Sequence, residues 1–246
     1  MKRLIALCLA FMLLCSLTAC GAQTKVTAQT QTAVKAGDII TIGSFEQDGD
    51  ENNGAEPIEW IVLSVDEEEG MAILLSRYAL INCYYHDEEV PFTWETSFLR
   101  SVMNEDLFPE MFTAEEMERI LPATLTTADK VYDDGTVPGG NETEDYLFFL
   151  TDDEVEEFLP DAASRLCTPT AYALEGGTWE VTENMVSERP FAFTEDEIGY
   201  CSWWLRSRGA TEQCMGMVYA DGSIPEYGTF GLNYRVGVRP AMCIAL

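Results

Sequence analysis

The residues with the clearest capacity for chemistry are the single histidine of the chain and the carboxylates that follow it. His86 precedes Asp87, Glu88 and Glu89 directly. An imidazole beside carboxylates can act as an acid–base group or contribute to a metal site. A lone histidine in an acidic loop is more often simply solvated, and no G-x-S-x-G or H-E-x-x-H motif accompanies it. The sequence therefore presents no catalytic constellation.

A second set of candidate ligands lies in the polar stretch 126–145, which we expect to be a long loop. Carboxylate oxygens are the ligands that Ca²⁺ prefers, but the regular spacing of an EF-hand is absent. We therefore expect no resident cofactor, and bound Ca²⁺ is the alternative that this loop leaves open. The carboxylates concerned are those of Asp133, Asp134, Glu142, Glu144 and Asp145.

Aromatic and amide side chains near the C-terminus form the third candidate set. Such residues are common in contact surfaces, although they are also ordinary strand and turn content. From them we predict a ligand-binding surface made by Tyr219, Tyr227, Asn233 and Tyr234, with Phe230 beside them.

The charge balance limits the classes of partner. The chain of 246 residues carries 43 Asp and Glu against 14 Lys and Arg, a formal net charge of −29. Such a surface repels nucleic acid and anionic lipid headgroups, so we expect no nucleic-acid partner. It suits a solvated secreted protein, a cation-binding protein or one that meets basic partners.

The N-terminus has the pattern of a targeting segment. Lys2 and Arg3 precede an apolar run, 4–17, that is too short to span a membrane stably. The following Leu-Thr-Ala-Cys-Gly resembles the bacterial lipobox, which implies cleavage before Cys20 and lipid on that residue; the alternative is an ordinary secretory signal. We predict a signal peptide at 1–20 with lipidated Cys20, a flexible tether at 21–36, and one globular domain at 37–246. This organisation implies a protein anchored on the outer face of the cell membrane.

Five cysteines remain after such processing, and the odd number leaves at least one thiol unpaired. Most are expected to be small buried hydrophobic residues. If one disulfide exists, the interpretation we favour is Cys201–Cys214, because both residues fall in the C-terminal strand region. The five are Cys83, Cys167, Cys201, Cys214 and Cys243.

The elements that must position these residues are short. Alternating and apolar runs predict strands at 38–43, 57–63 and 71–76, a buried strand at 146–150 and further strands after 200. A helix is predicted from Thr93 to a break at Pro109, and helices after capping boxes at Thr113 and Thr151, the first with Ile120 and Leu121 on its inner face. Another helix is predicted to begin at Thr168-Pro169 and stop at Gly176-Gly177, and 178–199 is expected to be irregular. This order favours an α+β fold with a mainly antiparallel sheet.

Two adjacent tryptophans, Trp203 and Trp204, begin the most distinctive motif. Neighbouring strand residues face opposite sides, so both indoles cannot fill the same core. We expect one to be an anchor and the other to line a surface or a groove.

Several motifs together resemble a family of bacterial extracellular proteins, domain of unknown function 6273, over about residues 37–246. The ending is similar to that of C-type-lectin-like and formylglycine-generating-enzyme-like domains, which implies a C-type-lectin-like domain. The motifs are Pro57-Ile58-Glu59-Trp60, TWETSFLR at 93–100, Leu150-Thr151, CTPTAYA at 167–173, CSWWLRS at 201–207 and GVRPA at 237–241.

The resemblance implies that Trp203, Trp204, Arg206 and Arg239 organise the core of the C-terminal sheet. Glu59 and Glu95 are the candidate partners of the two arginines. The copper-holding cysteine pair of the formylglycine enzymes is not matched, since Pro240 stands where they commonly have cysteine, which argues against oxidase activity.

We therefore expect a membrane-anchored lipoprotein that binds a glycan, peptide or protein ligand without catalysis. An extracellular hydrolase based on carboxylates and a structural accessory of an envelope complex are the alternatives.

Overall fold

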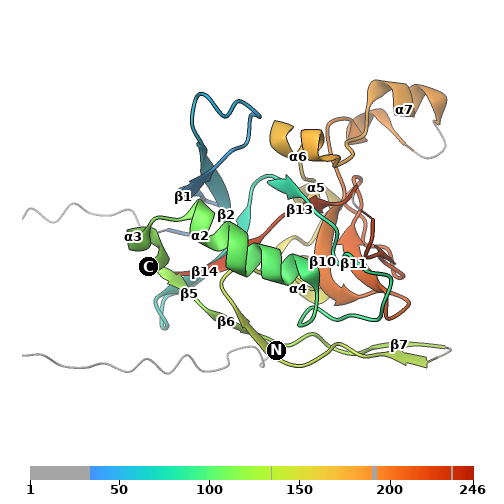
Figure 1. The fold of residues 1–246 in the computed structure, drawn as a ribbon, viewed down its shortest axis with the longest axis horizontal. Helices are drawn as coiled ribbons and strands as arrows, with labels where there is room; N and C mark the ends of the chain where they lie inside the picture. The colour runs from blue at the N-terminus through green and yellow to red at the C-terminus, as the bar shows by residue number, and fades with distance from the viewer. Residues whose placement is uncertain (1–33, 134, 190–192, 234) are drawn as a thin grey trace, which may run out of the picture. The chain divides into compact units, whose positions relative to one another are not determined.

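The computed structural model describes residues 34–133, 135–189, 193–233 and 235–246, and these belong to one compact unit, Val34–Leu246. The fold is α+β, with mainly antiparallel sheets and a few short helices, as predicted (Figure 1). The predicted signal peptide, Cys20 and most of the predicted tether lie outside the described residues. None of the helices in the described part of the chain is long and apolar enough to cross a membrane.

The first sheet joins the N-terminal strands to the last strand of the chain. Its order is β1-β2-β3-β14-β5, and every neighbouring pair is antiparallel. The three N-terminal strands lie where the apolar runs predict them, because those runs are bounded by glycine-rich and acidic turns. The strands are β1 (Ile39–Phe45), β2 (Glu56–Asp66), β3 (Met71–Ser76), β14 (Ala241–Ala245) and β5 (Ile120–Leu121).

The second sheet is built on the tryptophan motif. Its order is β12-β11-β10-β13-β4, and only the β10–β13 pair is parallel. The chain changes sheet four times, between β3 and β4, β4 and β5, β5 and β10, and β13 and β14. Residues of both sheets belong to one apolar core. The strands are β12 (Thr229–Phe230), β11 (Cys214–Val218), β10 (Trp203–Arg208), β13 (Gly237–Val238) and β4 (Ile81–Asn82).

The main helix differs from the prediction at both of its ends. It starts at Phe98 rather than Thr93, because the Ser97 side chain caps it by accepting the N–H of Arg100 at 3.2 Å. Pro109 does not break it: a π-helical segment, η1 (Val102–Leu107), follows α1 (Phe98–Ser101) and leads into α2 (Phe108–Met111). In this wider turn the Phe108 N–H donates to the Met103 carbonyl five residues back, and the proline ring is accommodated.

The remaining helices are short and capped by hydroxyl or carboxylate side chains. The predicted capping boxes at Thr113 and Thr151 are present, and each begins a helix. The first of these helices ends at Met117, because Ile120–Leu121 pairs with β14 as β5 instead of continuing the helix. The helices are α3 (Ala114–Met117), α4 (Asp152–Phe158), α5 (Ala162–Arg165), α6 (Ala171–Gly176), α7 (Glu183–Glu188) and η2 (Glu195–Glu197).

The polar stretch 126–145 is not the irregular loop that its composition predicts. It contains the hairpin of β7 (Lys130–Tyr132) and β8 (Gly135–Val137), and then β9 (Thr143–Asp145), which pairs with β6 (Ala123–Leu125). The two strands of the hairpin are short and pair locally; Val131 and Thr136 are exposed, whereas Val137 is buried. Figure 1 shows this hairpin and helix α7 extending away from the two sheets.

The apolar residues after this stretch are buried but do not form a strand. Phe148 makes a single bridge to Ala241, and the flanking residues 146–150 are otherwise irregular. Their backbone groups form hydrogen bonds with other elements; for example, the Leu150 carbonyl accepts the N–H of Arg206 at 2.8 Å.

Candidate functional site

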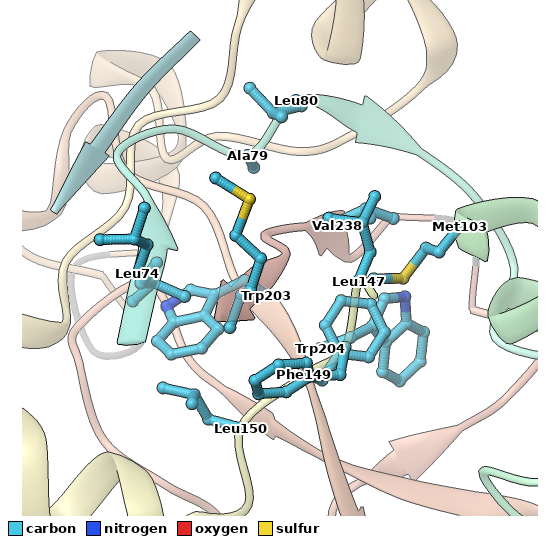
Figure 2. Close-up of a cluster of buried hydrophobic side chains, with 14 of the residues drawn as sticks. Leu74, Ala79, Leu80, Met103, Leu147, Phe149, Leu150, Trp203, Trp204 and Val238 are labelled. Carbon is cyan, nitrogen blue, oxygen red and sulfur yellow. The ribbon is translucent and has the colours of Figure 1, made fainter. Parts of the chain in front are cut away.

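The tryptophan motif is interior throughout. All six residues of β10 are buried, and both Trp203 and Trp204 are 0% exposed. The expectation that one indole lines a surface or groove is therefore wrong, because β10 is the central strand of its sheet and is covered on both faces. Figure 2 shows the two rings pointing in opposite directions, Trp203 toward Leu74 and Trp204 toward Met103.

Each indole N–H donates to a backbone carbonyl, so neither buried donor is left unpaired. Trp203 donates to the Arg165 carbonyl at 3.0 Å, and Trp204 donates to the Cys83 carbonyl at 3.3 Å. These bonds connect β10 to two segments distant in sequence. The motif therefore organises the core.

Arg206 is a buried organiser of the same strand. Its guanidinium is 1% exposed and donates to both carboxylate oxygens of Glu154, at 3.0 and 3.1 Å. It also donates to the carbonyls of Phe149 and Thr126, at 3.1 and 2.8 Å. Glu154 is the third residue of α4 and closes its capping box, so one carboxylate fixes both the helix start and the buried arginine.

Arg239 is buried without a carboxylate partner among the described residues. It donates to the carbonyls of Ser76 and Arg165, at 2.9 and 3.3 Å, and its guanidinium lies 4.8 Å from the centre of the Trp203 ring. Burial of a cation without a carboxylate is tolerated when carbonyl dipoles and an aromatic face surround it. The predicted core role of this residue agrees with its position.

The partners predicted for the two arginines are wrong. Glu59 pairs with the exposed Arg77 at 2.8 Å, and Glu95 accepts hydrogen bonds from Asn141. Glu59 lies on a strand of the first sheet, and Glu95 lies in the turn before α1. Neither position faces the interior around β10.

The cysteines are also arranged differently from the interpretation based on sequence. Cys201 and Cys214 both carry free thiols, so the Cys201–Cys214 disulfide is not present. In the β10–β11 register Trp203 faces Val218, which places Cys214 at the far end of the hairpin from Cys201. The residue beside Cys201 is instead Cys167, whose carbonyl accepts the Cys201 N–H at 2.9 Å.

His86 and the acids of 126–145 are not brought together as a site. The Nδ1 atom of His86 accepts the Phe98 N–H at 3.2 Å, and its ring stacks on Phe92 with centroids 4.7 Å apart. Asp145 is buried, and it accepts hydrogen bonds from Trp94, Arg100 and Thr143. The oxygens of Asp145 therefore already accept hydrogen bonds from protein donors, and Asp134 lies outside the described residues. Bound Ca²⁺ stays the untested alternative for this stretch.

The structure describes only part of the ligand-binding surface predicted near the C-terminus. Tyr219 and Tyr227 are 43% and 61% exposed, and Tyr227 stacks on Tyr132 with centroids 5.8 Å apart. Asn233 holds a turn, since its side chain donates to Thr229 and accepts the N–H of Arg235. Tyr234 lies outside the described residues, so this surface stays a prediction.

A hollow of about 370 Å³ lies between α6 and α7, within the size range of small-ligand sites. The segment 178–181 forms its floor, fixed by backbone bonds from Trp179 to Arg235 and from Val181 to Tyr200 at 3.1 and 2.9 Å. The left-handed residue Gly177, with φ of 116°, ends α6 and turns the chain into this floor. The lining includes Leu174, Trp179, Glu180, Met185, Glu188 and Arg189.

Trp179 is the exceptional tryptophan of the five in the chain. Its side chain is 49% exposed, whereas each of the other four is at most 1% exposed. The guanidinium of Arg235 lies 3.5 Å from the centre of its ring, which holds the indole in place by a cation–π contact. The hollow thus offers an ordered aromatic surface with charged groups of both signs at its edge.

Sequence reasoning missed this hollow, because 178–199 has no regular periodicity and looks irregular. A usable signal was Thr182, which caps α7 by accepting the Met185 N–H and so places a helix directly after Trp179. The cation–π partner Arg235 is distant in sequence, and nothing local identifies it.

A second, acidic grouping lies on the loop between β1 and β2. Carboxylate oxygens of Glu46, Asp48 and Glu56 lie within 4.8 Å of one another. Desolvation and the neighbouring Glu56 and Asp48 raise the pKa of Glu46, whereas the Asp50 N–H lowers the pKa of Asp48. Backbone N–H groups already occupy oxygens of all three, including Gln47 to Glu56 at 2.7 Å. A shallow hollow of about 290 Å³, lined by Asp48 and Tyr78, adjoins the grouping.

Comparison with known proteins identifies a family. The model described as Domain of unknown function (DUF6273) matches residues 69–246, well over half of the chain, and confirms the predicted family. The match begins in the turn before β3, so β1 and β2 precede it. No curated protein and no solved structure matches the chain.

Proposed function

The chain belongs to the family described as Domain of unknown function (DUF6273), and we propose that it is a membrane-anchored extracellular lipoprotein that binds a ligand without catalysing a reaction. The lipobox-like sequence at Cys20 supports a lipid anchor on the outer face of the cell membrane. The ligand is a glycan, a peptide or a protein. Nucleic acid is disfavoured by the net charge of −29.

The observation that carries the binding proposal is the half-exposed Trp179 in the hollow between α6 and α7. An exposed indole costs free energy in water, and its flat face binds sugar rings and apolar side chains. Arg189 and Glu188 at the same hollow supply hydrogen bonds that orient a polar ligand. A fixed aromatic surface with polar groups around it is the usual composition of a binding site.

We further propose that the fold is of the C-type-lectin-like kind. The mainly antiparallel sheets, the few short helices and the tryptophan strand in the core support this assignment. A crystal structure that superposes β10, β11 and β14 on lectin-like domains would establish it.

The test is a glycan and peptide array screen with the purified protein, with and without Ca²⁺. We expect binding that Trp179→Ala reduces at least tenfold, while Tyr219→Ala, an exposed aromatic outside the hollow, leaves it unchanged. Loss of binding in Tyr219→Ala or Tyr227→Ala instead would move the site to the predicted aromatic surface. Binding to no array, with co-purification of one envelope protein, would favour the accessory role.

An extracellular hydrolase is the second candidate, and the acidic grouping favours it. A carboxyl with raised pKa beside one with lowered pKa is the arrangement of a general acid and its partner. Hydrolysis of a polysaccharide panel by the wild-type protein, lost in Glu46→Gln but kept in Glu69→Gln, would establish this candidate. Glu69 is a suitable control because it lies in the exposed turn between β2 and β3.

The lipid anchor is tested by Cys20→Ala. We expect the variant protein to appear in the culture medium, whereas wild-type protein stays with the membrane fraction. Wild-type and variant protein in the same fraction would contradict the anchor.

A further inference from the structure

Cys167 and Cys201 form a close pair of buried thiols. Cys167 is 1% exposed and Cys201 is 0% exposed. The Cys201 N–H donates to the Cys167 carbonyl at 2.9 Å, and the two thiols lie close enough for each to shift the pKa of the other. Because a single N–H···O bond joins the two residues, their Cα atoms lie at most roughly 6.8 Å apart, and disulfides span Cα separations of roughly 4.4–6.8 Å.

The pair lies at the base of one continuous segment. Residues 167–201 leave the core at Cys167, form α6, the Trp179 floor and α7, and return at Cys201 immediately before β10. Every residue that lines the hollow lies between the two cysteines. A covalent bond at this base would close the whole segment into a loop.

We propose that Cys167 and Cys201 form a disulfide that closes the 167–201 segment at its base. The oxidant is an external disulfide, such as that of a thiol–disulfide oxidoreductase. The Cys167 thiolate attacks one sulfur of that disulfide and displaces a thiolate. The Cys201 thiolate then attacks the Cys167 sulfur of the mixed disulfide and releases the second external thiol. Two protein thiols are oxidised, one external disulfide is reduced to two thiols, and the protons pass to the leaving thiolates.

In the closed segment, the surroundings favour the thiolate of Cys167 over that of Cys201. Burial acts to raise its pKa, but the hydrogen bond with Cys201 and the charge of Arg239 outweigh burial and lower the pKa to about 7. The same contact raises the pKa of Cys201 above its ordinary value. Because both sulfurs are buried, exchange takes place while the base of the segment is open, during folding or local unfolding.

The other thiols do not compete at this position. Burial, together with the charge of Asp87, raises the pKa of Cys83 to about 11, so little thiolate is available there. Cys214 lies at the far end of the β10–β11 hairpin, where it contacts the Thr211 hydroxyl at 3.2 Å.

Peptide mapping tests the pairing directly. Cleavage after glutamate places the five cysteines in five separate peptides: 70–88, 158–175, 198–212, 213–226 and 227–246. After treatment of the purified protein with oxidised glutathione and denaturing alkylation, we expect 158–175 and 198–212 to be joined and lighter by two hydrogens. Alkylation of both peptides as free thiols, or joining of 198–212 to 213–226, would overturn the proposal.

Thermal unfolding tests the closing role. The disulfide should raise the Tm of the oxidised protein by roughly 8–14 °C over the reduced protein, since it closes a long loop. The difference should persist in Cys83→Ser and vanish in the double variant Cys167→Ser, Cys201→Ser. A mapped disulfide with equal Tm in both redox states would overturn the closing role, and a double variant that does not fold leaves the mapping as the deciding measurement.

One consequence depends on the binding function proposed above. The disulfide would keep the segment around Trp179 and α7 in their positions at the hollow. Binding of ligands on the array should therefore weaken when the disulfide is reduced. Because mapping needs no ligand, failure to bind and failure to form the disulfide are separate results.

Discussion

The strand β10 and the hollow between α6 and α7 differ in almost every respect. The strand contains the most distinctive residues of the sequence, and all six of them are buried. The hollow comes from a stretch with no clear pattern, yet it contains the one half-exposed tryptophan. Dense motifs of large residues can therefore mark the interior of a protein, and the surface that meets a ligand can be inconspicuous.

Arg206→Ala tests the interior half of this comparison and should have the largest effect. Removing a buried guanidinium leaves the Glu154 carboxylate and two carbonyls without their donor, which costs about 3–5 kcal/mol. Urea unfolding of the variant and wild type measures this loss. The control is Arg77→Ala, whose ion pair with Glu59 is exposed and should cost under about 1 kcal/mol. Equal losses in the two variants would break the distinction between interior and surface arginines.

Asp152→Asn tests whether the partly buried Asp152 carboxylate makes the stability of the protein depend on pH. Burial acts to raise the pKa of Asp152, but hydrogen bonds from Lys130 and Ser207 outweigh it, so the pKa is below its ordinary value. A carboxyl with a lowered pKa stabilises the fold above its unfolded pKa and loses that contribution as the pH falls through the folded pKa. The free energy of unfolding of wild type should exceed that of the variant by about 1 kcal/mol at pH 7. This difference should shrink as the pH falls below the ordinary pKa of an aspartate, about 3.9. If the difference in free energy of unfolding between wild type and variant did not change with pH, the charge of Asp152 would not be its cause.

Trp179→Ala tests the hollow and should leave stability almost unchanged, within about 1 kcal/mol, because half of the side chain is already in solvent. Its fluorescence is the sharper measurement. The other four tryptophans are buried, so acrylamide should quench mainly Trp179 in wild type and very little in the variant. Equal quenching in both proteins would show that the core is more open than the structure indicates.

Tyr227→Ala should have the smallest effect. The ring is 61% exposed and touches the Tyr132 ring, so its removal should change the free energy of unfolding by about 0.5 kcal/mol or less. Thermal unfolding provides the comparison with Trp179→Ala. A loss of more than about 2 kcal/mol in the free energy of unfolding would show that the Tyr132–Tyr227 contact stabilises the fold as strongly as a buried contact does.

The sequence predicts the local features of the fold well. Strands β1 to β3 and the capping boxes at Thr113 and Thr151 depend on neighbouring residues, and they are present at the predicted places. The start of the helix at Phe98 was missed because the apolar periodicity extends back to Trp94, whereas the helix begins only after the Ser97 cap. Ile120–Leu121 was misassigned because β14, distant in the chain, provides its partner.

The candidate site was less predictable, because it depends on contacts between distant segments. Arg206 and Arg239 were recognised as organisers, but their partners Glu154 and Ser76 follow from the packing of the sheets. The contact between Trp179 and Arg235 joins residues that only the fold brings together. Residue type indicates what a side chain can do, and tertiary structure decides what it meets.

The place of the last two strands determines when the fold can be completed. β13 lies between β10 and β4, and β14 lies between β3 and β5, so the final residues join both sheets. Leu75 pairs with Ala241 across most of the chain, and contacts of such sequence separation slow folding. Neither sheet can close until residues 237–245 have been synthesised. Until then β3 presents an open edge to other chains, and early termination of synthesis would yield a product prone to aggregation.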